Sequence, residues 1–368
     1  MWRFSNSHLG DYFRCPRMRF LRYHSGGTGW VRKGINWDLL MGTFCHTVCC
    51  GVLRNEGLEF AIGAAQREFM GEVSKVEGAN PFYAAAYQAL GEALARDWVK
   101  IRLPVIQQYY EVAGVEQEYI VPLAGDVELM VRPDAELKRR VDGEIWALEF
   151  KTTGFNSVDY YDSWSYSTQT LTHCLGLDRK YGRQTMGVCM EFLYKGMKRK
   201  DQQGVDQFYS PLIRGYSAGP LPPFNSEYIQ WDSSYARKKG YDAVNVWDKM
   251  GLQDWIDQLP SEVLEEQLAT REIYRKRREL EIWQRQTLRL EQRIRDGAQW
   301  FDPKGPENIV QCDRAMDEVF PARLDRYCFS NEYRKTCPYL GVCFKGEEMS
   351  EENGFERRTP HHVGEFDE

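Results

Sequence analysis

Residues 145–151 read Ile-Trp-Ala-Leu-Glu-Phe-Lys, and this run determines what the rest of the chain is expected to build. Side chains alternate between the two faces of a strand, so Glu149 and Lys151 would project to the same side. The apolar side chains at the even positions would point to the opposite side, where a layer of helices can bury them. The run therefore predicts a strand that is buried on one face and carries an acid and a lysine on the other.

The preceding stretch supplies a second acid. Residues 127–137 have the composition of a strand, and the dipeptide at 142–143, Asp-Gly, favours a two-residue hairpin turn. With that turn, Asp134 would lie opposite Lys151, and opposed residues on paired strands share a face. A longer loop through residues 138–140 would shift this pairing. We predict that Asp134 converges with the acid and the lysine of the next strand.

Two carboxylates beside a lysine suit a divalent metal ion. Asp134 and Glu149 offer the hard oxygen ligands that Mg²⁺ and Mn²⁺ prefer, and the Phe150 carbonyl is a further candidate ligand. A bound ion can activate water and neutralise the charge that develops on a phosphate, and Lys151 would support the water or the phosphate. The same pattern also arises by chance on solvated strand faces, so the prediction depends on the flanking residues.

Two flanking residues extend this candidate site. His46 follows Gly42 by four residues at an expected helix start, where a neutral imidazole could complete the metal shell. Gln169 opens an expected helix after the strand and could contact Lys151 or a DNA phosphate. Each also has an ordinary interpretation, as a helix histidine and as a glutamine without a role.

Cysteines cluster near the end of the chain. Cys328, Cys337 and Cys343 lack a nearby histidine, and the best candidate for a fourth thiol is Cys15, with Cys312 as the runner-up. The sequence has no signal peptide and no apolar run long enough to cross a bilayer, which argues for a cytoplasmic protein without disulfides. Clustered thiols then indicate a bound metal, and four thiolates suit either zinc or an iron–sulfur cluster. The remaining cysteines are expected to be small buried hydrophobes: Cys45, Cys49, Cys50, Cys174 and Cys189.

These motifs occur in one order between residues 5 and 343. The positions concerned are Ser5, Ser7, Tyr12, Cys15, Pro16, Phe20 and Tyr23, then Gly42, His46, Asp134, Glu149, Lys151 and Gln169, and finally Phe320, Pro321, Cys328, Cys337, Pro338 and Cys343. In this order they resemble the RecB-like, iron–sulfur branch of the PD-(D/E)XK nuclease superfamily, which includes CRISPR-associated four-cysteine exonucleases, the AddB nuclease domain and many phage exonucleases. Two positions depart from the family pattern. The gap between Cys328 and Cys337 is longer than usual, and His173 stands where a tyrosine usually follows the glutamine.

The resemblance implies an α/β fold with a restriction-endonuclease-like core, in which helices flank a mixed central sheet, plus helical additions and an iron–sulfur region. It also implies a Mg²⁺- or Mn²⁺-dependent DNA exonuclease. The implied residues are Asp134, Glu149, Lys151 and Gln169 for catalysis, His46, Asp134, Glu149 and Phe150 for the metal ion, and Cys15, Cys328, Cys337 and Cys343 for a [4Fe–4S] cluster. Such a cluster would tie the two ends of the chain together.

The same resemblance implies a role at single-stranded DNA or DNA ends, in recombination, repair or phage DNA processing. Expected partners beyond DNA are a helicase, a recombinase or an annealing protein. The expected location is the cytoplasm of a bacterial, archaeal or phage-infected cell, with no membrane. The formal net charge of −6 argues against attraction of the whole molecule to DNA but allows a local basic groove.

Two other classes of protein stay open. One is a noncatalytic DNA-binding or assembly subunit that keeps the same fold, and the other is a redox protein that uses a cluster for electron transfer. The presence of Asp134, Glu149 and Lys151 together favours catalysis. No flavin or nucleotide motif accompanies the cysteines, which places the redox protein last.

Five segments are expected along the chain: residues 1–41 with the first cluster cysteine, a nuclease core at 42–200, an insertion and long helix at 201–300, an iron–sulfur region at 301–345, and a flexible acidic tail at 346–368. Residues 42–113 are expected to be helical and 205–240 irregular. Residues 261–296 are expected to form one long helix, packed on the core or protruding as an arm.

Overall fold

The computed structural model describes most of the chain. The described residues are 1–25, 28–200, 206–213, 251–298, 317–323, 328, 336–360, 362 and 365. Two predictions fall outside them, in whole or in large part: the irregular stretch at 205–240 and the candidate ligand Cys312. Among the described residues, no helix is both long enough and apolar enough to cross a membrane.

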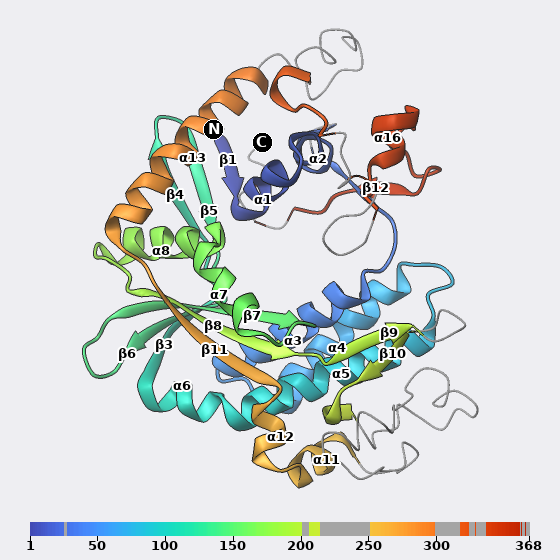
Figure 1. Cartoon of the computed structure of the whole chain (residues 1–368), viewed down its shortest axis with the longest axis vertical. Helices are drawn as coiled ribbons and strands as arrows, with labels where there is room; N and C mark the ends of the chain where they lie inside the picture. The colour runs from blue at the N-terminus through green and yellow to red at the C-terminus, as the bar shows by residue number, and fades with distance from the viewer. Residues whose placement is uncertain are drawn as a thin grey trace.

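A mixed five-stranded sheet lies at the centre of the molecule (Figure 1). Its strands, in spatial order, are β11 (Leu268–Tyr274), β8 (Gly187–Tyr194), β7 (Ile145–Thr153), β6 (Ala135–Arg139) and β3 (Tyr110–Val115). β7 and β8 run parallel, whereas the other neighbouring strands run antiparallel. The predicted α/β class, with a mixed sheet between helices, is confirmed.

Helices cover both faces of this sheet. One face packs against a layer of four helices, α3 (Trp37–Leu53), α4 (Leu58–Ser74), α5 (Pro81–Ile101) and α6 (Leu103–Tyr109). Trp146, Leu148 and Phe150 of β7 are buried in that core, as their alternation predicted. The opposite face of β7 packs against α8 (Thr168–Tyr181). The helical prediction for residues 42–113 is confirmed up to residue 109, after which β3 begins.

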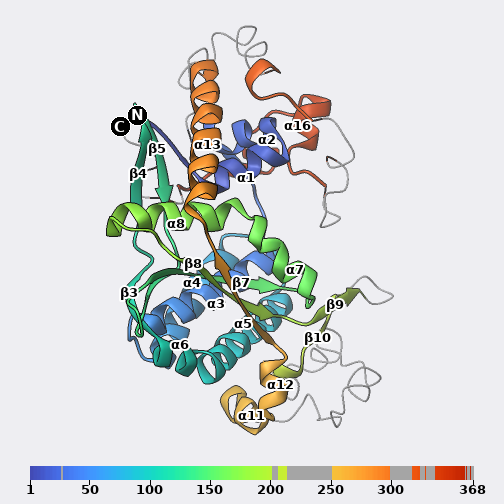
Figure 2. The same cartoon turned by 60° about the vertical axis from the view of Figure 1, so that its left-hand side comes forward.

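A second, three-stranded sheet stands on the other side of α8 (Figure 2). It contains β1 (Trp2–Ser5), β5 (Val127–Val131) and β4 (Tyr119–Ala124), in that order. α8 contacts strands of both sheets, and the long helix α13 (Arg277–Ala298) packs against α8, β4 and β5. The helix α13 therefore packs on the core and does not protrude as an arm.

The stretch predicted as one strand at residues 127–137 is two strands in two different sheets. β5 ends at Val131 and β6 begins at Ala135. Pro133 lies between them, and a proline cannot donate a hydrogen bond to a continuing strand ladder. The break allows the chain to leave the second sheet and enter the central one. It also places Asp134 in a bend rather than within a strand.

The predicted pairing between β6 and β7 is wrong by two residues. Ala135 lies opposite Leu148, whereas a two-residue turn would have placed it opposite Phe150. A type I′ turn needs positive φ at both central residues, but of the pair Asp142 and Gly143 only the glycine has one, at 72°. The main-chain nitrogen of Arg139 instead donates to the Glu144 carbonyl, which leaves a four-residue loop. An even displacement keeps each side chain on its predicted face.

The single helix predicted at residues 261–296 is also wrong. This stretch forms the short helix α12 (Ser261–Glu265), then β11, then α13. β11 pairs antiparallel with β8 along its full length, so it hydrogen-bonds a strand edge of the central sheet that would otherwise be open. The central sheet thus takes a strand from outside the predicted core at 42–200. The long-range pairing with β8 determines the strand conformation of β11. The apolar pattern expected for a helix was already interrupted nearby, at Lys276.

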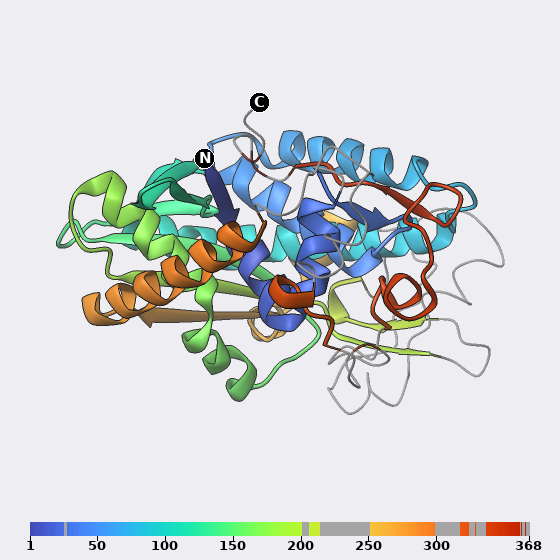
Figure 3. The ribbon, with the colours of Figure 1, turned by 90° about the horizontal axis from the view of Figure 1, so that it is seen from above.

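The N-terminal segment packs against the C-terminal part of the chain (Figure 3). It forms α1 (Asn6–Arg14), α2 (Pro16–Arg19), the π-helix η1 (Phe20–His24) and β2 (Trp30–Arg32). Arg19 makes two hydrogen bonds of 2.7 Å to Glu291 of α13, and both side chains are fully buried. Two charges enclosed in this way hold α2 against α13 at a fixed position, because neither can lose its partner without a large cost.

The segment predicted as a flexible acidic tail is partly packed. Its strand β12 (Phe355–Arg357) pairs antiparallel with β2. Arg358 forms an ion pair with Glu365, and His362 Nδ1 lies 2.9 Å from Glu118 Oε2. The acidic composition of the tail did not reveal these contacts, because they depend on residues far away in the sequence. The preceding helix, α16 (Leu340–Lys345), belongs to the predicted iron–sulfur region.

The remaining helices and strands complete the described part of the chain. They are α7 (Val158–Ser163), the 3₁₀ helix η2 (Trp164–Tyr166), the strands β9 (Met197–Lys200) and β10 (Asp206–Tyr209), η3 (Pro211–Ile213) and α11 (Leu252–Gln258). Of these, α7 and η2 connect β7 to α8 and therefore lie next to the predicted site.

Candidate active site

Asp134 is held in the bend between β5 and β6. Its Oδ2 accepts a hydrogen bond of 2.7 Å from the Phe150 main-chain nitrogen. Its Oδ1 lies 2.8 Å from Nε2 of His46, which comes from α3. The residue is 9% exposed, and both of its carboxylate oxygens have a partner. The structure therefore brings together three of the residues predicted for metal binding.

Glu149 lies at the middle of β7 and Lys151 nearer to its C-terminal end. They lie on one face of the strand, as predicted, and the lysine Nζ contacts Glu149 Oε1. The lysine Nζ also lies 5.2 Å from the centre of the Trp164 ring, a cation–π contact that limits its movement. Glu149 is 3% exposed, whereas the Lys151 side chain is 24% exposed. The lysine is thus the member of the pair that an incoming ligand can reach.

The first turns of α8 bring two more side chains to Glu149. The helix begins after Ser167, whose hydroxyl accepts a hydrogen bond from the Gln169 main-chain nitrogen. Gln169, expected to contact Lys151 or a phosphate, instead donates its amide to Glu149 Oε1 at 2.6 Å. His173 Nε2 lies 3.0 Å from Glu149 Oε2. His173 was not predicted as a site residue, although its position one turn after Gln169 placed it on the same helix face.

The charges of this group support one another. Burial by itself would raise the pKa of Glu149, but Lys151 and His173 outweigh it and lower this pKa to about 2. Burial would likewise lower the pKa of Lys151, yet Glu149 and Asp134 raise it. Glu149 is therefore ionised and Lys151 charged at neutral pH. A buried carboxylate kept in its ionised form is what a cation ligand requires.

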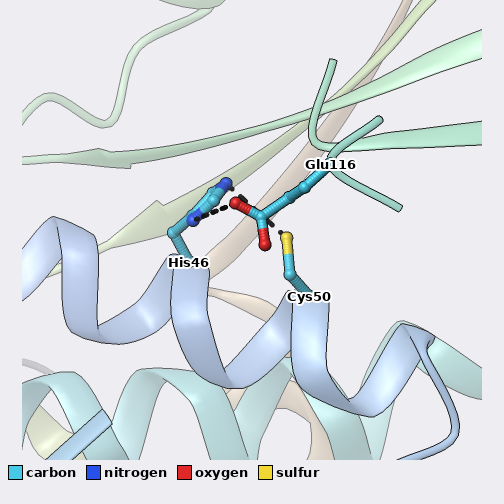
Figure 4. A group of neighbouring side chains, drawn as sticks. All are labelled: His46, Cys50 and Glu116. Carbon is cyan, nitrogen blue, oxygen red and sulfur yellow. Dashed lines mark hydrogen bonds and ion pairs between the residues drawn. The ribbon is translucent and has the colours of Figure 1, made fainter. Parts of the chain in front are cut away.

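His46 has a second set of neighbours (Figure 4). Its Nδ1 lies 3.9 Å from Glu116 Oε1, and Cys50 Sγ lies 3.5 Å from its Nε2. Burial would lower the pKa of His46, but the Asp134 carboxylate and Glu116 raise it to about 9. Cys50 is buried as predicted, but it is also a neighbour of this site rather than only a packing residue. Glu116 had no motif to mark it.

Four cysteines from the two ends of the chain line one cavity. They are Cys15, Cys328, Cys337 and Cys343. Cys15 lies between α1 and α2, Cys343 lies in α16, and the main-chain nitrogen of Cys337 donates to the Cys328 carbonyl at 2.9 Å. Burial, the Cys328 thiol and the Cys15 thiol raise the pKa of Cys337. The structure thus brings together the four thiols that the sequence grouped.

A comparison with protein-family models gives one finding that decides the family. The model described as the PD-(D/E)XK nuclease superfamily matches residues 3–344. The chain belongs to this superfamily. A comparison with curated proteins gives no match.

The residues that match the letters of the PD-(D/E)XK name lie close to one another in the structure. Pro133-Asp134 lies at the bend before β6, and Glu149-Phe150-Lys151 lies in the second half of β7. The proline ends one strand and so creates the bend that holds the aspartate, while the spacing of glutamate and lysine places both on one strand face. In this chain, the motif therefore describes one three-dimensional arrangement formed by two adjacent strands.

Gly42 explains how α3 can bring His46 to the PD-(D/E)XK motif. The helix begins after Asn36, whose side chain accepts a hydrogen bond from the Leu39 main-chain nitrogen. A Cβ atom added at Gly42 would lie 2.9 Å from Thr152 Oγ1 at the end of β7. A residue without a side chain thus lets the helix approach the strand one turn before the histidine.

Proposed function

We propose that this PD-(D/E)XK protein is a Mg²⁺- or Mn²⁺-dependent DNA exonuclease of the RecB-like, iron–sulfur branch. The observation that carries the proposal is the convergence of Asp134, just before β6, with Glu149 and Lys151 in the second half of β7. Both carboxylates are nearly buried, yet neighbouring groups keep the glutamate ionised. Nothing in a merely structural strand pair requires this arrangement.

The donor set fits a hard divalent cation. Asp134, Glu149 and the Phe150 carbonyl supply oxygen. His46, once the ion has displaced the proton that its raised pKa retains, supplies a nitrogen that favours Mn²⁺ over Mg²⁺. A bound ion would supply activation of water and neutralisation of charge on the scissile phosphate. Lys151 would hold that water or a phosphate oxygen through its partly exposed ammonium group. Gln169 and His173 would keep Glu149 in position through their hydrogen bonds.

Exposed aromatic rings beside the site support a substrate with unpaired bases. Tyr166 is 89% exposed and Phe155 is 56% exposed, and both lie in the connection between β7 and α8. Trp164, in the same connection, contacts Lys151. Aromatic side chains stack on bases that are not paired in a duplex. We infer that this connection binds single-stranded DNA, or the frayed end of a duplex, next to the reacting phosphate.

The four cysteines fit a [4Fe–4S] cluster. Among the described residues, the four thiols do not form a group whose ligand atoms all lie within 4.8 Å of one another. Four thiolates around one zinc ion would be roughly 3.8 Å apart, from Zn–S bonds of about 2.3 Å in a tetrahedron. A wider spread, with four thiols lining a cavity, favours one thiolate on each of four irons. We therefore propose Cys15, Cys328, Cys337 and Cys343 as the cluster ligands.

The proposal extends to context as the family resemblance implies it. The exonuclease would act in recombination, repair or phage DNA processing, with a helicase, a recombinase or an annealing protein as its partner. These assignments rest on the resemblance and not on a contact in the structure.

A cleavage assay tests the catalytic proposal. Anaerobically prepared protein is incubated with single- and double-stranded DNA, labelled at either end, in the presence of Mg²⁺ or Mn²⁺. We expect progressive degradation from an end, which Glu149→Ala and Lys151→Ala each abolish while DNA binding remains, because phosphate contacts elsewhere hold the strand. Glu262→Ala, an exposed acid in α12 and outside the connection between β7 and α8, serves as the control and should cleave normally.

Two results would contradict the proposal in different ways. Full activity in both Glu149→Ala and Lys151→Ala would remove the assignment of the site. DNA binding by the unaltered protein without any cleavage would favour the noncatalytic subunit instead.

A further inference from the structure

We propose that His46, Cys50 and Glu116 form a separate site for Zn²⁺, and that zinc bound there stops the nuclease. The inhibitory part rests on the proposed nuclease function, whereas the binding site itself does not. The three residues come from α3 and from the turn between β3 and β4 (Figure 4). One ligand atom from each lies within 4.8 Å of the other two.

The spacing of the three side chains allows a shared ion. Cys50 follows His46 by one helical turn, so both side chains leave α3 on the same face. The pairs Cys50 Sγ to His46 Nε2 and Glu116 Oε1 to His46 Nδ1 are 3.5 Å and 3.9 Å apart. Ligand atoms around tetrahedral zinc are about 3.5 Å apart, because the metal–ligand bonds are about 2.0–2.3 Å long. These two distances run to different ring nitrogens, and one ion takes only one of them. The imidazole or the Glu116 side chain therefore has to rotate before the three donors, which lie within 4.8 Å of one another, share an ion.

Glu116 is held in place before any ion binds. Its backbone has a φ of 50°, a left-handed conformation that residues other than glycine seldom adopt. Its main-chain nitrogen donates to the Asp134 carbonyl at 3.0 Å, and Arg54 Nη1 donates to its Oε2 at 2.8 Å. Arg54 thus occupies one carboxylate oxygen and leaves the other facing His46. A strained residue whose side chain is oriented by a partner is typical of a binding site.

The chemistry of the donors distinguishes this site from the proposed catalytic one. A thiolate and an imidazole favour Zn²⁺, whereas Mg²⁺ prefers oxygen ligands. His46 belongs to both sites, because its Nε2 also lies 2.8 Å from Asp134 Oδ1. Zinc at the new site would take the imidazole away from Asp134 and the catalytic ion. Inhibition follows from competition for one side chain, without any movement of the fold.

Zinc binding is measured first, without reference to activity. Equilibrium dialysis against Zn²⁺ in excess Mg²⁺ gives the number of zinc ions held per chain. We expect Cys50→Ser and Glu116→Gln each to hold one fewer zinc ion than the unaltered protein. Cys49→Ser is the matched control, because Cys49 is the adjacent residue, equally buried and outside the site. The four cysteines at the chain ends are the same in every variant, so any zinc they hold cancels.

Inhibition is measured next, with the rate of each variant normalised to its own rate without zinc. We expect the half-inhibitory zinc concentration to rise more than tenfold in Cys50→Ser and in Glu116→Gln. Arg54→Ala, which frees Glu116, should raise it by about tenfold, the usual effect of losing a group that orients a ligand. Cys49→Ser should match the unaltered protein.

The outcomes separate the two proposals. An unchanged zinc count in both Cys50→Ser and Glu116→Gln would overturn the site, whatever the nuclease does. A lost zinc ion with unchanged inhibition would overturn the inhibitory role but keep the site. A lost zinc ion in a protein that cleaves no DNA would keep the site and overturn the proposed function, together with inhibition. Because Glu116 is partly exposed, its variant remains informative even if Cys50→Ser fails to fold.

Discussion

Two buried carboxyl groups in this protein show how environment sets the role of a residue. Glu149 is 3% exposed and contacts a lysine, a glutamine and a histidine, which keep its pKa low. Asp97 of α5 is fully buried, and neither of its carboxylate oxygens has a hydrogen-bond partner in the structure. Burial therefore raises the pKa of Asp97 to about 8. The first group is prepared to bind a cation, and the second only weakens the fold when it ionises.

Asp97 gives a prediction about pH and stability. Its pKa is raised on folding from 3.8 to about 8, so the folded state holds the proton more tightly than the unfolded state. Its contribution to stability is complete below pH 3.8 and is lost progressively as pH rises to about 8. Asp97→Asn keeps a neutral side chain at every pH. At pH 8 we expect the variant to have a free energy of unfolding that is higher by at least about 1 kcal/mol, since each pKa unit is worth about 1.4 kcal/mol. Its unfolding temperature should be higher as well.

Thermal melts across the pH range check this prediction. The difference between Asp97→Asn and the unaltered protein should shrink as the pH falls toward 4. Asp159→Asn, at an exposed position of α7, provides the control. A difference that did not vary with pH would show that the Asp97 carboxyl has a partner in solution.

At the scale of single residues, strand alternation is a local rule, and it placed Glu149 and Lys151 on one face of β7. Asp134 was grouped with them through a strand pairing that was wrong by two residues, an even displacement that kept the predicted face. Motif spacing missed Glu116 and Cys50, because their place beside His46 depends on a turn and a helix that meet only in the folded chain. The sequence did contain one usable signal, the four-residue spacing from His46 to Cys50.

At the scale of elements, the connection from β7 to α8 is predicted to bind unpaired bases. Tyr166→Ala should weaken binding of single-stranded DNA by between about fivefold and a hundredfold, since stacking one base contributes about 1–3 kcal/mol. Binding of a blunt duplex should change little, because its bases are already stacked. Fluorescence anisotropy in a Glu149→Ala background measures both affinities without cleavage.

Tyr109→Ala is the control for this prediction. Tyr109 is 55% exposed but lies in α6, at the opposite face of the central sheet. An equal loss of affinity in both variants, or an equal loss on duplex and single strands, would rule out stacking on Tyr166.

Predictions of helices and strands succeeded where the local sequence pattern determines the conformation. They failed where a partner far away in the sequence determines it. The helical region was recognised up to residue 109, and the burial pattern of β7 was correct. β11 was assigned to a helix because its partner, β8, lies between 75 and 87 residues earlier in the chain. The β6–β7 register was misjudged because the turn type depends on a backbone angle at Asp142 that the residue types do not fix.

At the scale of the whole molecule, the four cysteines are predicted to join the chain ends. Anaerobically prepared protein should be brown, with about four irons per chain. Cys15→Ser, Cys337→Ser and Cys343→Ser should each lose the colour and lower the unfolding temperature, because closing a loop of this length removes entropy from the unfolded chain. Iron analysis, absorption spectra and thermal melts provide the measurements.

Cys174→Ser is the matched control for these variants. Cys174 is fully buried in α8, away from the cavity, and should keep its iron. Colourless protein with one tightly held zinc ion would overturn the iron–sulfur assignment but not the joining of the ends. A full iron–sulfur cluster in Cys15→Ser would overturn the prediction that the cluster joins the two ends of the chain.

The pairing of β2 with β12 also has a consequence for the order in which the protein can be completed during synthesis. The two strands are separated by about 320 residues, so the first leaves the ribosome long before its partner exists. At roughly 5–20 residues per second, the N-terminal segment waits on the order of 15–65 seconds for that partner. The residues of the proposed active site lie between residues 46 and 173 and emerge well within that interval. The catalytic core can therefore begin to assemble while the segment that will close the molecule is still untranslated.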